Sequence, residues 1–245
     1  MSYNTILGTD TANTLIGTNG ADSIAALDGN DTVILDGNDL IYLDAGNDSL
    51  SMNSDLTSGS VYGGAGDDTF NIALTANSSL FDGDGGNDTL SLNTTPLTST
   101  LAGGSGDDSI ILNKAVTGVT ISGGNASSTT GDGADTLYVS GSFVSSSMEG
   151  NGGNDTLTIG GKVNASTVRG GTGNDTLSIA GSVTGSTLYG DKGSDTIKLN
   201  AGTVKSALIQ GGSNLDTTAD SKDLISIGVA ITSSTIQGNA GADTI

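Results

Sequence analysis

Aspartate residues recur at regular intervals, each at the end of a segment rich in glycine or asparagine and just before an alternating apolar stretch. In the first part the recurring residues are spaced 9, 9, 8 and 9 apart: Asn13, Asp22, Asp31, Asp39 and Asp48. The spacing then becomes 20, with two larger steps of 27 and 28: Asp68, Asp88, Asp108, Asp135, Asp155, Asp175, Asp195, Asp223 and Asp243. Carboxylates in phase with a turn can bind cations, whereas an acidic face that is merely solvated needs no fixed phase.

The composition favours a cation as the partner and argues against several other classes. The 245 residues include a single Glu, seven Lys or Arg, no His and no Cys, and the formal net charge is −20. Nucleic acids and anionic membranes attract clustered basic residues, and no apolar run is long enough to span a bilayer. We therefore expect no nucleic-acid binding and no direct membrane insertion, and the lack of His and Cys argues against zinc sites and nucleophilic triads.

The elements that position these aspartates are short strands in a repeat. Residues 150–210 hold three near-copies, each with a glycine-rich turn closed by an aspartate, an alternating apolar strand, a second turn and a second short strand. A unit this small cannot bury its own apolar face, so copies must stack on one another. The sequence predicts an all-β fold, a right-handed parallel β-roll or β-helix solenoid with two strands and about 17–20 residues per coil.

Apolar residues fill the same registers in every coil. One set follows each aspartate by two and four residues, as Leu157 and Ile159 follow Asp155. Two further sets, which include Val163 and Val168, are assigned to the second strand. Alternation with a period of two places such residues on one face of a strand, so we expect a thin aliphatic core between two sheets.

We expect one continuous domain that changes along its length. In residues 1–48 the half-coils are short, so Asp22 should stack with Asp39 on one edge and Asp31 with Asp48 on the other. In residues 49–245 the coils have 20 residues, aspartate turns occupy one edge, and the opposite turns lack ligand side chains of comparable charge. Inserts around residues 126–132 and 214–222 account for the two long steps. The last residues stop halfway through a coil, which suggests a fragment of a longer protein.

The segment Gly170–Leu177, GGTGNDTL, resembles the calcium-binding nonapeptide G-G-x-G-x-D-x-U-x of RTX (repeats-in-toxin, hemolysin-type) proteins. Close copies begin at Gly63 and Gly103. Degenerate copies replace the second glycine by residues that tolerate a left-handed backbone: Asp84, Asn151, Asp191 and Asn239. About a dozen copies in phase make the resemblance specific.

The resemblance implies multiple Ca²⁺ ions, each held between the turns of adjacent coils by glycine-loop carbonyls and aspartate carboxylates. Carried over residue by residue, the metal ligands are Asp22, Asp31, Asp39, Asp48, Asp68, Asp88, Asp108, Asp135, Asp155, Asp175, Asp195 and Asp243, with loop residues Gly63, Gly66, Gly103, Gly106, Gly170 and Gly173. Asp223 is left out because Ser221 and Lys222 precede it where Gly and Asn usually stand. The alternative for each aspartate is a turn residue that hydrogen-bonds the backbone. The preceding asparagines, such as Asn174, are expected to form a hydrogen-bonded ladder.

The resemblance also implies a cellular role. We expect a calcium-binding structural region of a secreted bacterial surface protein, of surface-layer or adhesin type, which folds and stiffens on extracellular calcium and leaves the cell by type I secretion without a cleavable N-terminal signal. Self-association or a cell-surface polysaccharide are possible partners. One alternative is an accessory or secretion module of an RTX enzyme or toxin, and we expect no catalytic residue in this chain. Another is an ice- or glycan-binding adhesin face, although the Thr172 and Asn174 pair does not recur in neighbouring loops.

Overall fold

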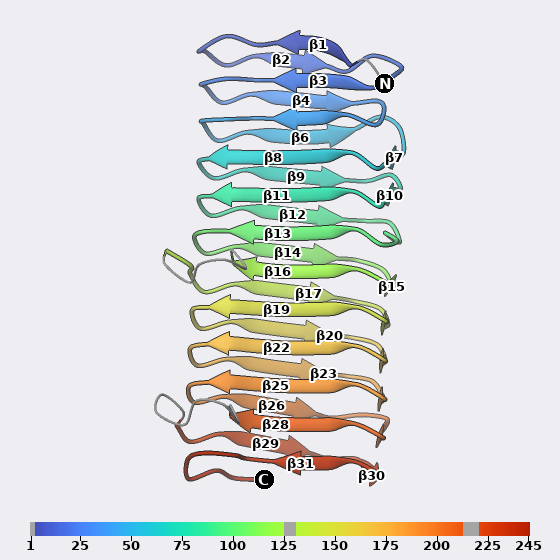
Figure 1. The fold of residues 1–245 in the computed structure, drawn as a ribbon, viewed down its shortest axis with the longest axis vertical. Helices are drawn as coiled ribbons and strands as arrows, with labels where there is room; N and C mark the ends of the chain where they lie inside the picture. Colours follow the sequence, from blue (N-terminus) through green and yellow to red (C-terminus); the bar gives the residue numbers. More distant parts are fainter. Residues whose placement is uncertain (1–2, 125–130, 213–220) are drawn as a thin grey trace.

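The computed structural model describes residues 3–124, 131–212 and 221–245. Over these residues the chain forms parallel strands and turns, without a helix. Each strand pairs with the strand one coil later, so that the coils stack into a ladder (Figure 1). The predicted all-β solenoid is confirmed. None of the described residues forms a helix long and apolar enough to cross a membrane.

A 12-stranded parallel sheet forms one broad side. Its strands are β1 (Asn4–Leu7), β3 (Asp22–Ala25), β5 (Leu40–Tyr42), β8 (Ser60–Ala65), β11 (Leu80–Gly85), β13 (Thr100–Gly104), β16 (Thr120–Gly124), β19 (Ser147–Gly152), β22 (Thr167–Thr172), β25 (Thr187–Lys192), β28 (Leu208–Gly212) and β31 (Thr235–Gln237).

An 11-stranded parallel sheet forms the other broad side. Its strands are β2 (Thr14–Ile16), β4 (Thr32–Leu35), β6 (Ser49–Met52), β9 (Thr69–Ile72), β12 (Thr89–Leu92), β14 (Ser109–Leu112), β17 (Thr136–Val139), β20 (Thr156–Ile159), β23 (Thr176–Ile179), β26 (Thr196–Leu199) and β29 (Leu224–Ile227). The turns from the 12-stranded to the 11-stranded sheet contain the regularly spaced aspartates, from Asp31 to Asp243. We call this side the Asp edge.

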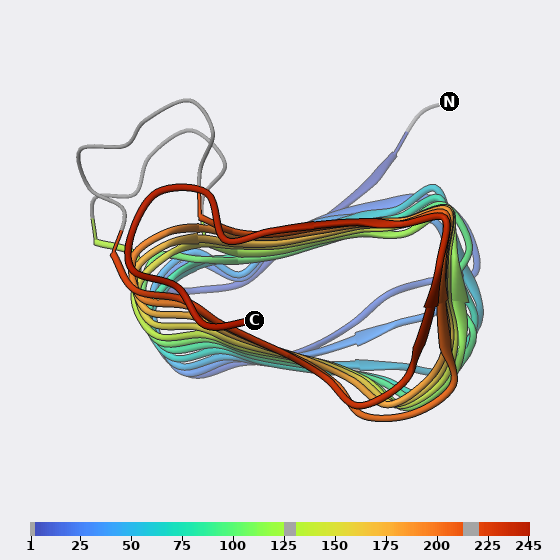
Figure 2. The same cartoon turned by 90° about the horizontal axis from the view of Figure 1, so that it is seen from below.

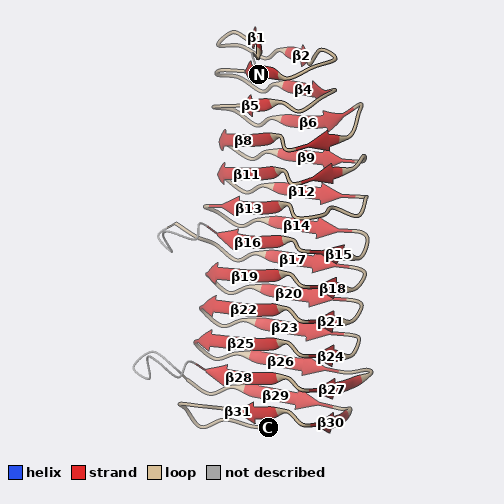
Figure 3. Cartoon of the chain, turned by 45° about the vertical axis from the view of Figure 1, so that its right-hand side comes forward, coloured by secondary structure: helices blue, strands red, loops and turns tan. Residues whose placement is uncertain are grey.

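The opposite edge contains a third, narrow row of strands that the sequence did not predict (Figures 2 and 3). These strands are β7 (Leu56–Thr57), β10 (Ala76–Asn77), β15 (Val116–Thr117), β18 (Phe143–Val144), β21 (Val163–Asn164), β24 (Val183–Thr184), β27 (Thr203–Lys205) and β30 (Ala230–Thr232). Single bridges through Leu97 connect β10 to β15. The two apolar sets assigned to one second strand therefore lie on two strands. The bend between them uses a residue with positive φ, such as Ala165 (φ 49°).

The predicted apolar ladders form one continuous core. Leu157 and Ile159 from the 11-stranded sheet, Val163 from the narrow row and Val168 from the 12-stranded sheet are all fully buried. The exceptions are near the C-terminal end, where Ile231 is 46% exposed. The core fixes the register of every turn, because a slip of one residue would turn the apolar side chains outward.

The coils lengthen along the chain. Asp31 and Asp48, one coil apart, are separated by 17 residues, whereas Asp48 and Asp68 are separated by 20. The additional residues form the narrow row, which begins at β7. Most of the two predicted inserts, residues 125–130 and 213–220, lies outside the described residues, and the strands on either side of each insert keep their pairing.

Candidate metal sites

The aspartates of the Asp edge point into the solenoid. Asp68 lies on the same inward face as Phe70 and Ile72, and its side chain is almost fully buried. Equivalent residues stack one above the other, and each is at most 2% exposed: Asp31, Asp48, Asp68, Asp88, Asp108, Asp135, Asp155, Asp175, Asp195 and Asp223. Asp243, in the last coil, is partly exposed. We call this set the Asp column.

One oxygen of each carboxylate accepts a hydrogen bond from a backbone N–H of the preceding coil. The backbone N–H of Asp48 donates to Asp68 Oδ1 (2.8 Å), and that of Asp68 donates to Asp88 Oδ1 (2.7 Å). The same bond repeats to the end of the column, where the Asp195 N–H donates to Asp223 Oδ1 and the Asp223 N–H to Asp243 Oδ1. The alternative that each aspartate bonds the backbone therefore accounts for one of its two oxygens.

The second oxygen has no hydrogen-bond partner along most of the column. Oδ2 is buried and unpartnered in Asp31, Asp48, Asp68, Asp88, Asp108, Asp135, Asp155 and Asp175. A buried acceptor without a donor costs about 1–3 kcal/mol, and more when it is charged. A row of such oxygens is what a bound cation would satisfy.

The first glycine of each turn makes room for this oxygen. A Cβ atom built on Gly63 would overlap both Asp68 Oδ2 and the carbonyl oxygen of Gly83 in the next coil. Gly103 and Gly170 stand in the same relation to Asp108 and Asp175. Carboxylate and carbonyl oxygens thus approach the same small space, and oxygen-only donors suit Ca²⁺.

The other predicted loop residues shape the turn. Gly66, Gly106 and Gly173 have φ between 119° and 138°, and the carbonyl oxygens of Gly66 and Gly173 face the equivalent glycine one coil later. At the second position, Asp84, Asn151, Asp191 and Asn239 have φ between 67° and 77°. The prediction that these residues replace glycine in a left-handed conformation is confirmed.

Burial raises the pKa of the Asp column residues from Asp48 to Asp175. Desolvation, followed by repulsion from neighbouring carboxylates, raises the pKa of Asp68, Asp88, Asp108 and Asp155 to about 7, and that of Asp135 to about 9. Burial likewise raises the pKa of Asp48 and Asp175 to about 6. The hydrogen bonds from the backbone oppose these shifts without cancelling them. A positive ion would remove the penalty.

A second, exposed ladder runs beside the column. Asn174 N–H donates to Asn154 Oδ1 (2.7 Å), and Ser194 N–H donates to Asn174 Oδ1 (2.8 Å). Asn47, Asp67, Asn87 and Asp107 continue this pattern in earlier coils. The predicted asparagine ladder is confirmed, with backbone N–H groups as the donors.

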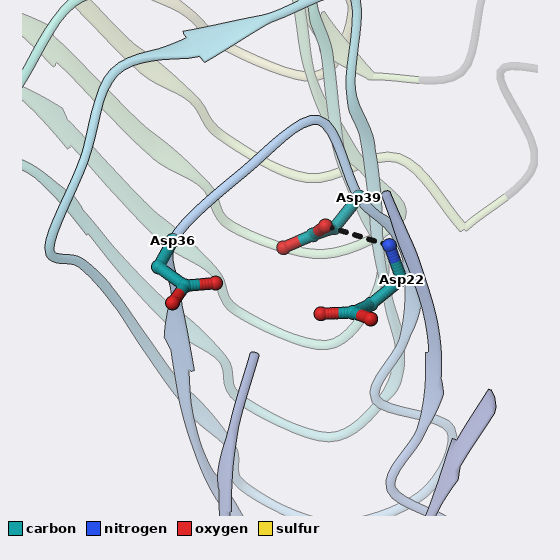
Figure 4. Close-up of side chains that lie close together, drawn as sticks. All are labelled: Asp22, Asp36 and Asp39. Atoms are coloured by element: carbon teal, nitrogen blue, oxygen red, sulfur yellow. Dashed lines mark hydrogen bonds between the residues drawn. The ribbon is translucent and has the colours of Figure 1, made fainter. Parts of the chain in front are cut away.

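On the opposite edge, the described carboxylates are Asp22, Asp36, Asp39 and Asp55, all of which precede β8. Asp22 N–H donates to Asp39 Oδ1 (2.9 Å), so these two residues stack as predicted. Asp36 joins them, and one carboxylate oxygen from each of the three lies within 4.8 Å of the other two (Figure 4). Burial raises the pKa of Asp39 to about 6.

Serine takes the place of aspartate farther along the opposite edge. Strand register places Gly59 and Ser79 in the column that Asp22 and Asp39 begin. Ser166 Oγ accepts the Ser146 N–H (3.1 Å) and donates to the Asn164 carbonyl oxygen (2.8 Å). We call this set the Ser column: Ser79, Ser99, Ser146, Ser166, Ser186 and Ser234.

Sequence reasoning missed three acidic residues at these sites. Asp223 belongs to the Asp column despite its atypical loop. Asp132, from the end of the first insert, accepts the Gly152 N–H at Oδ2, and its buried Oδ1 has no partner. Asp36 directly follows the strand β4. The sequence feature that could have identified it is the spacing of 8 residues between Asp31 and Asp39, where the neighbouring spacings are nine.

Comparison with known families agrees with this geometry. The family model described as RTX calcium-binding nonapeptide repeat (4 copies) matches residues 7–37, 35–50, 60–71, 98–113, 164–178, 183–203 and 233–245. The chain carries RTX calcium-binding nonapeptide repeats. The RTX matches leave out residues 114–163, yet Asp135 and Asp155 continue the same hydrogen-bonded column there. The repeat is therefore more regular in space than in sequence.

Among solved structures, the chain is similar to a hyperactive, Ca²⁺-dependent, β-helical antifreeze protein from an Antarctic bacterium. The two share 21% identity with a TM-score of 0.63, over 96% of this chain and 83% of that one. At this identity the likeness concerns the fold. No curated protein sequence matches the chain.

Proposed function

We propose that this RTX chain is a calcium-stiffened structural rod of a secreted bacterial surface protein. The observation that carries the proposal is the Asp column, in which buried, unpartnered Oδ2 atoms recur in successive coils from Asp48 to Asp175 beside glycine carbonyls. The RTX repeat that matches this chain is a calcium-binding repeat. The structural role follows from the regular core, which contributes stiffness along the whole row of coils.

The Asp column links folding to calcium. Folding without a cation would bury rows of unpaired carboxylates, each at a cost, in a chain of net charge −20. An ion that binds only the folded state stabilises it by mass action. High extracellular calcium would therefore favour the rod, and low intracellular calcium would leave the chain extended and ready for secretion.

Titration with calcium tests this proposal. Metal-free protein at pH 8 should show little β structure by far-ultraviolet circular dichroism, and calcium should restore it reversibly. Asp175→Asn should weaken calcium binding and lower the Tm in calcium, whereas Ser178→Ala, in the neighbouring strand, should do neither. A fully folded chain at pH 8 without metal would contradict calcium-driven folding.

A surface role fits the repeat better than a catalytic one. Adjacent acidic pairs such as Asp67 and Asp68 divide between the exposed ladder and the buried Asp column, so each member already has a structural partner. An accessory module of an RTX enzyme or toxin is an alternative use for such a rod. A cell-surface polysaccharide or a second copy of the chain would be its binding partner in the surface role.

One observation favours an ice-binding face as a second candidate function. The outer side of the 11-stranded sheet presents hydroxyl side chains in direct register over seven coils: Thr69, Thr89, Ser109, Thr136, Thr156, Thr176 and Thr196. Strand stacking spaces them about 4.7–4.9 Å apart. Calcium-loaded protein should then inhibit ice recrystallisation, and Thr156→Tyr should abolish the effect while preserving the circular dichroism spectrum. If ice recrystallises at the same rate with and without the folded, calcium-loaded protein, this candidate function is ruled out.

A further inference from the structure

The same pentapeptide, Leu-Asp-Gly-Asn-Asp, folds in two ways in this chain. In residues 27–31, Leu27 has φ of 72° and begins the turn on the Asp edge. In residues 35–39, Leu35 ends β4, buried in the core, and the turn starts one residue later at Asp36. The first aspartate of each copy, Asp28 or Asp36, therefore meets different surroundings.

Strand alternation explains this difference. Inward positions follow Asp22 at Ile24 and Ala26, so Leu27 falls outside the strand. They follow Asp31 at Val33 and Leu35, so the leucine of the second copy is drawn into the core. The turn then has only three residues before Asp39, and this brings Asp36 close to the stacked pair of Asp22 and Asp39.

The oxygens of this group converge without satisfying one another. Asp36 Oδ1 and Asp39 Oδ2 are buried and lack hydrogen-bond partners, and Asp39 is only 1% exposed. A Cβ atom on Gly17 would lie 2.9 Å from the first oxygen and 3.2 Å from the second, so both face one small space. Figure 4 shows the three carboxylates turned toward a common region.

The charge of the group has no side-chain counterion near it in sequence. The first 113 residues contain 16 Asp and neither Lys nor Arg. Asp22 is held by Thr18, whose N–H donates to Oδ2 (2.5 Å) and whose hydroxyl lies 2.9 Å from Oδ1. These bonds orient Asp22 but bring no positive charge. Three carboxylates this close require a cation or protons.

We propose that Asp22, Asp36 and Asp39 bind a single divalent cation on the opposite edge, with Asp36 as a ligand from outside the repeated aspartate positions. The inference rests on the proposed calcium function. An all-oxygen, three-carboxylate site selects a hard ion such as Ca²⁺. Asp36 also lines an open pocket with Gly20, Asn38 and Ser54, which gives water access to complete the coordination shell.

The site has a distinct structural task. It links the turns before Asp22 and Asp39, in the part of the opposite edge that precedes the narrow row and the Ser column. Binding there stabilises the first coils rather than the whole rod. A site with three carboxylates should also bind calcium more tightly than sites that rely mainly on carbonyl oxygens, because affinity rises with ligand charge.

The repeated pentapeptide supplies a matched pair of variants. Calcium bound per full-length chain is measured by equilibrium dialysis for wild type, Asp36→Asn, Asp28→Asn and Asp175→Asn. We expect Asp36→Asn to lose one tight site, or to weaken it roughly tenfold, while Asp28→Asn keeps the wild-type count. Hydrogen exchange should locate the loss of protection in residues 14–57. Wild-type binding by Asp36→Asn would overturn the inference.

The Asp175→Asn arm separates the two levels of the proposal. If Asp175→Asn loses calcium and Asp36→Asn does not, the calcium rod stands and the opposite-edge site is wrong. If neither variant changes binding, both fail. Should Asp36→Asn not fold, anomalous diffraction from wild-type crystals grown with Tb³⁺ decides: an ion coordinated by Asp36 supports the site, and an ion shell without Asp36 overturns it.

Discussion

The two edges of the solenoid hydrogen-bond successive coils through different side chains, aspartate on one edge and serine on the other. On both, inward side chains accept a backbone N–H of the preceding coil, as Asp175 Oδ1 does for Asp155 and Ser166 Oγ does for Ser146. Val119 and Ala207 interrupt this series on the opposite edge. The serine hydroxyl then donates its own proton to the Asn164 carbonyl oxygen. The aspartate has no proton to donate, and its Oδ2 is left without a partner. The Ser column is complete by itself, whereas the Asp column requires an added positive charge.

Because of this difference, we expect calcium dependence at the Asp edge and not at the Ser column. Removing the cation should open the turns of the Asp edge and leave the hydrogen bonds of the Ser column intact until the sheets themselves separate. A solenoid built this way combines a permanent edge with a conditional one. The rod is therefore expected to be folded only where enough calcium is present to bind at the Asp edge.

Acidification should produce the largest effect on the metal-free chain. The pKa of Asp column residues from Asp48 to Asp175 is raised in the fold, to about 6 for Asp48, about 7 for Asp68 and about 9 for Asp135 against an ordinary 3.8, so the folded state binds more protons than the unfolded one. This destabilisation is relieved as the pH falls through these values. Metal-stripped protein should therefore gain β structure between pH 8 and pH 5. In calcium the affinity should fall over the same range, because protons compete for Oδ2.

Circular dichroism of metal-stripped protein in calcium-free buffer measures the first effect, and calorimetric titration measures the second. The Ser column does not titrate in this range, so it contributes to neither. A metal-free chain whose β content stays constant from pH 8 to pH 5 would show that the Asp column does not limit folding.

Glycine substitutions should give a smaller but local contrast. Alanine at Gly170 would overlap Asp175 Oδ2 and the Gly190 carbonyl oxygen, and should cost about 3 kcal/mol in calcium. Alanine at Gly185, on the opposite edge, meets open space, and Ala165 already holds the equivalent place with φ of 49°. It should cost about 1 kcal/mol or less. Equal losses by chemical denaturation in calcium would remove the distinction between the edges.

Removing one serine should have the smallest effect. Ser166→Ala leaves the buried Ser146 N–H without its acceptor and should cost about 1–2 kcal/mol, while the Asn164 carbonyl oxygen keeps the Ser145 N–H as a donor. Because no cation is involved, the loss should be the same at saturating and at limiting calcium, provided the chain is folded. Calcium-dependent destabilisation by Ser166→Ala would mean that the two edges are coupled.

Much of the fold and the Asp column could be predicted because both follow from period. Alternation identified the buried apolar ladders, and the spacing of the aspartates identified which residues stack. The third row of strands could not be predicted in the same way. Val163 and Val168 both read as inward residues, and only the bend at Ala165, with positive φ, places them on separate strands.

The sequence by itself determined the repeat, the polarity of each turn and the need for a cation. Tertiary structure decided what identical segments do. Leu27–Asp31 and Leu35–Asp39 have the same five residues, yet one forms an ordinary Asp-edge turn and the other contributes Asp36 to a group of three carboxylates. The physical reason is the alternation of the strand before each copy. One leucine falls after the last inward position, while the other is the last inward residue and is held in the core.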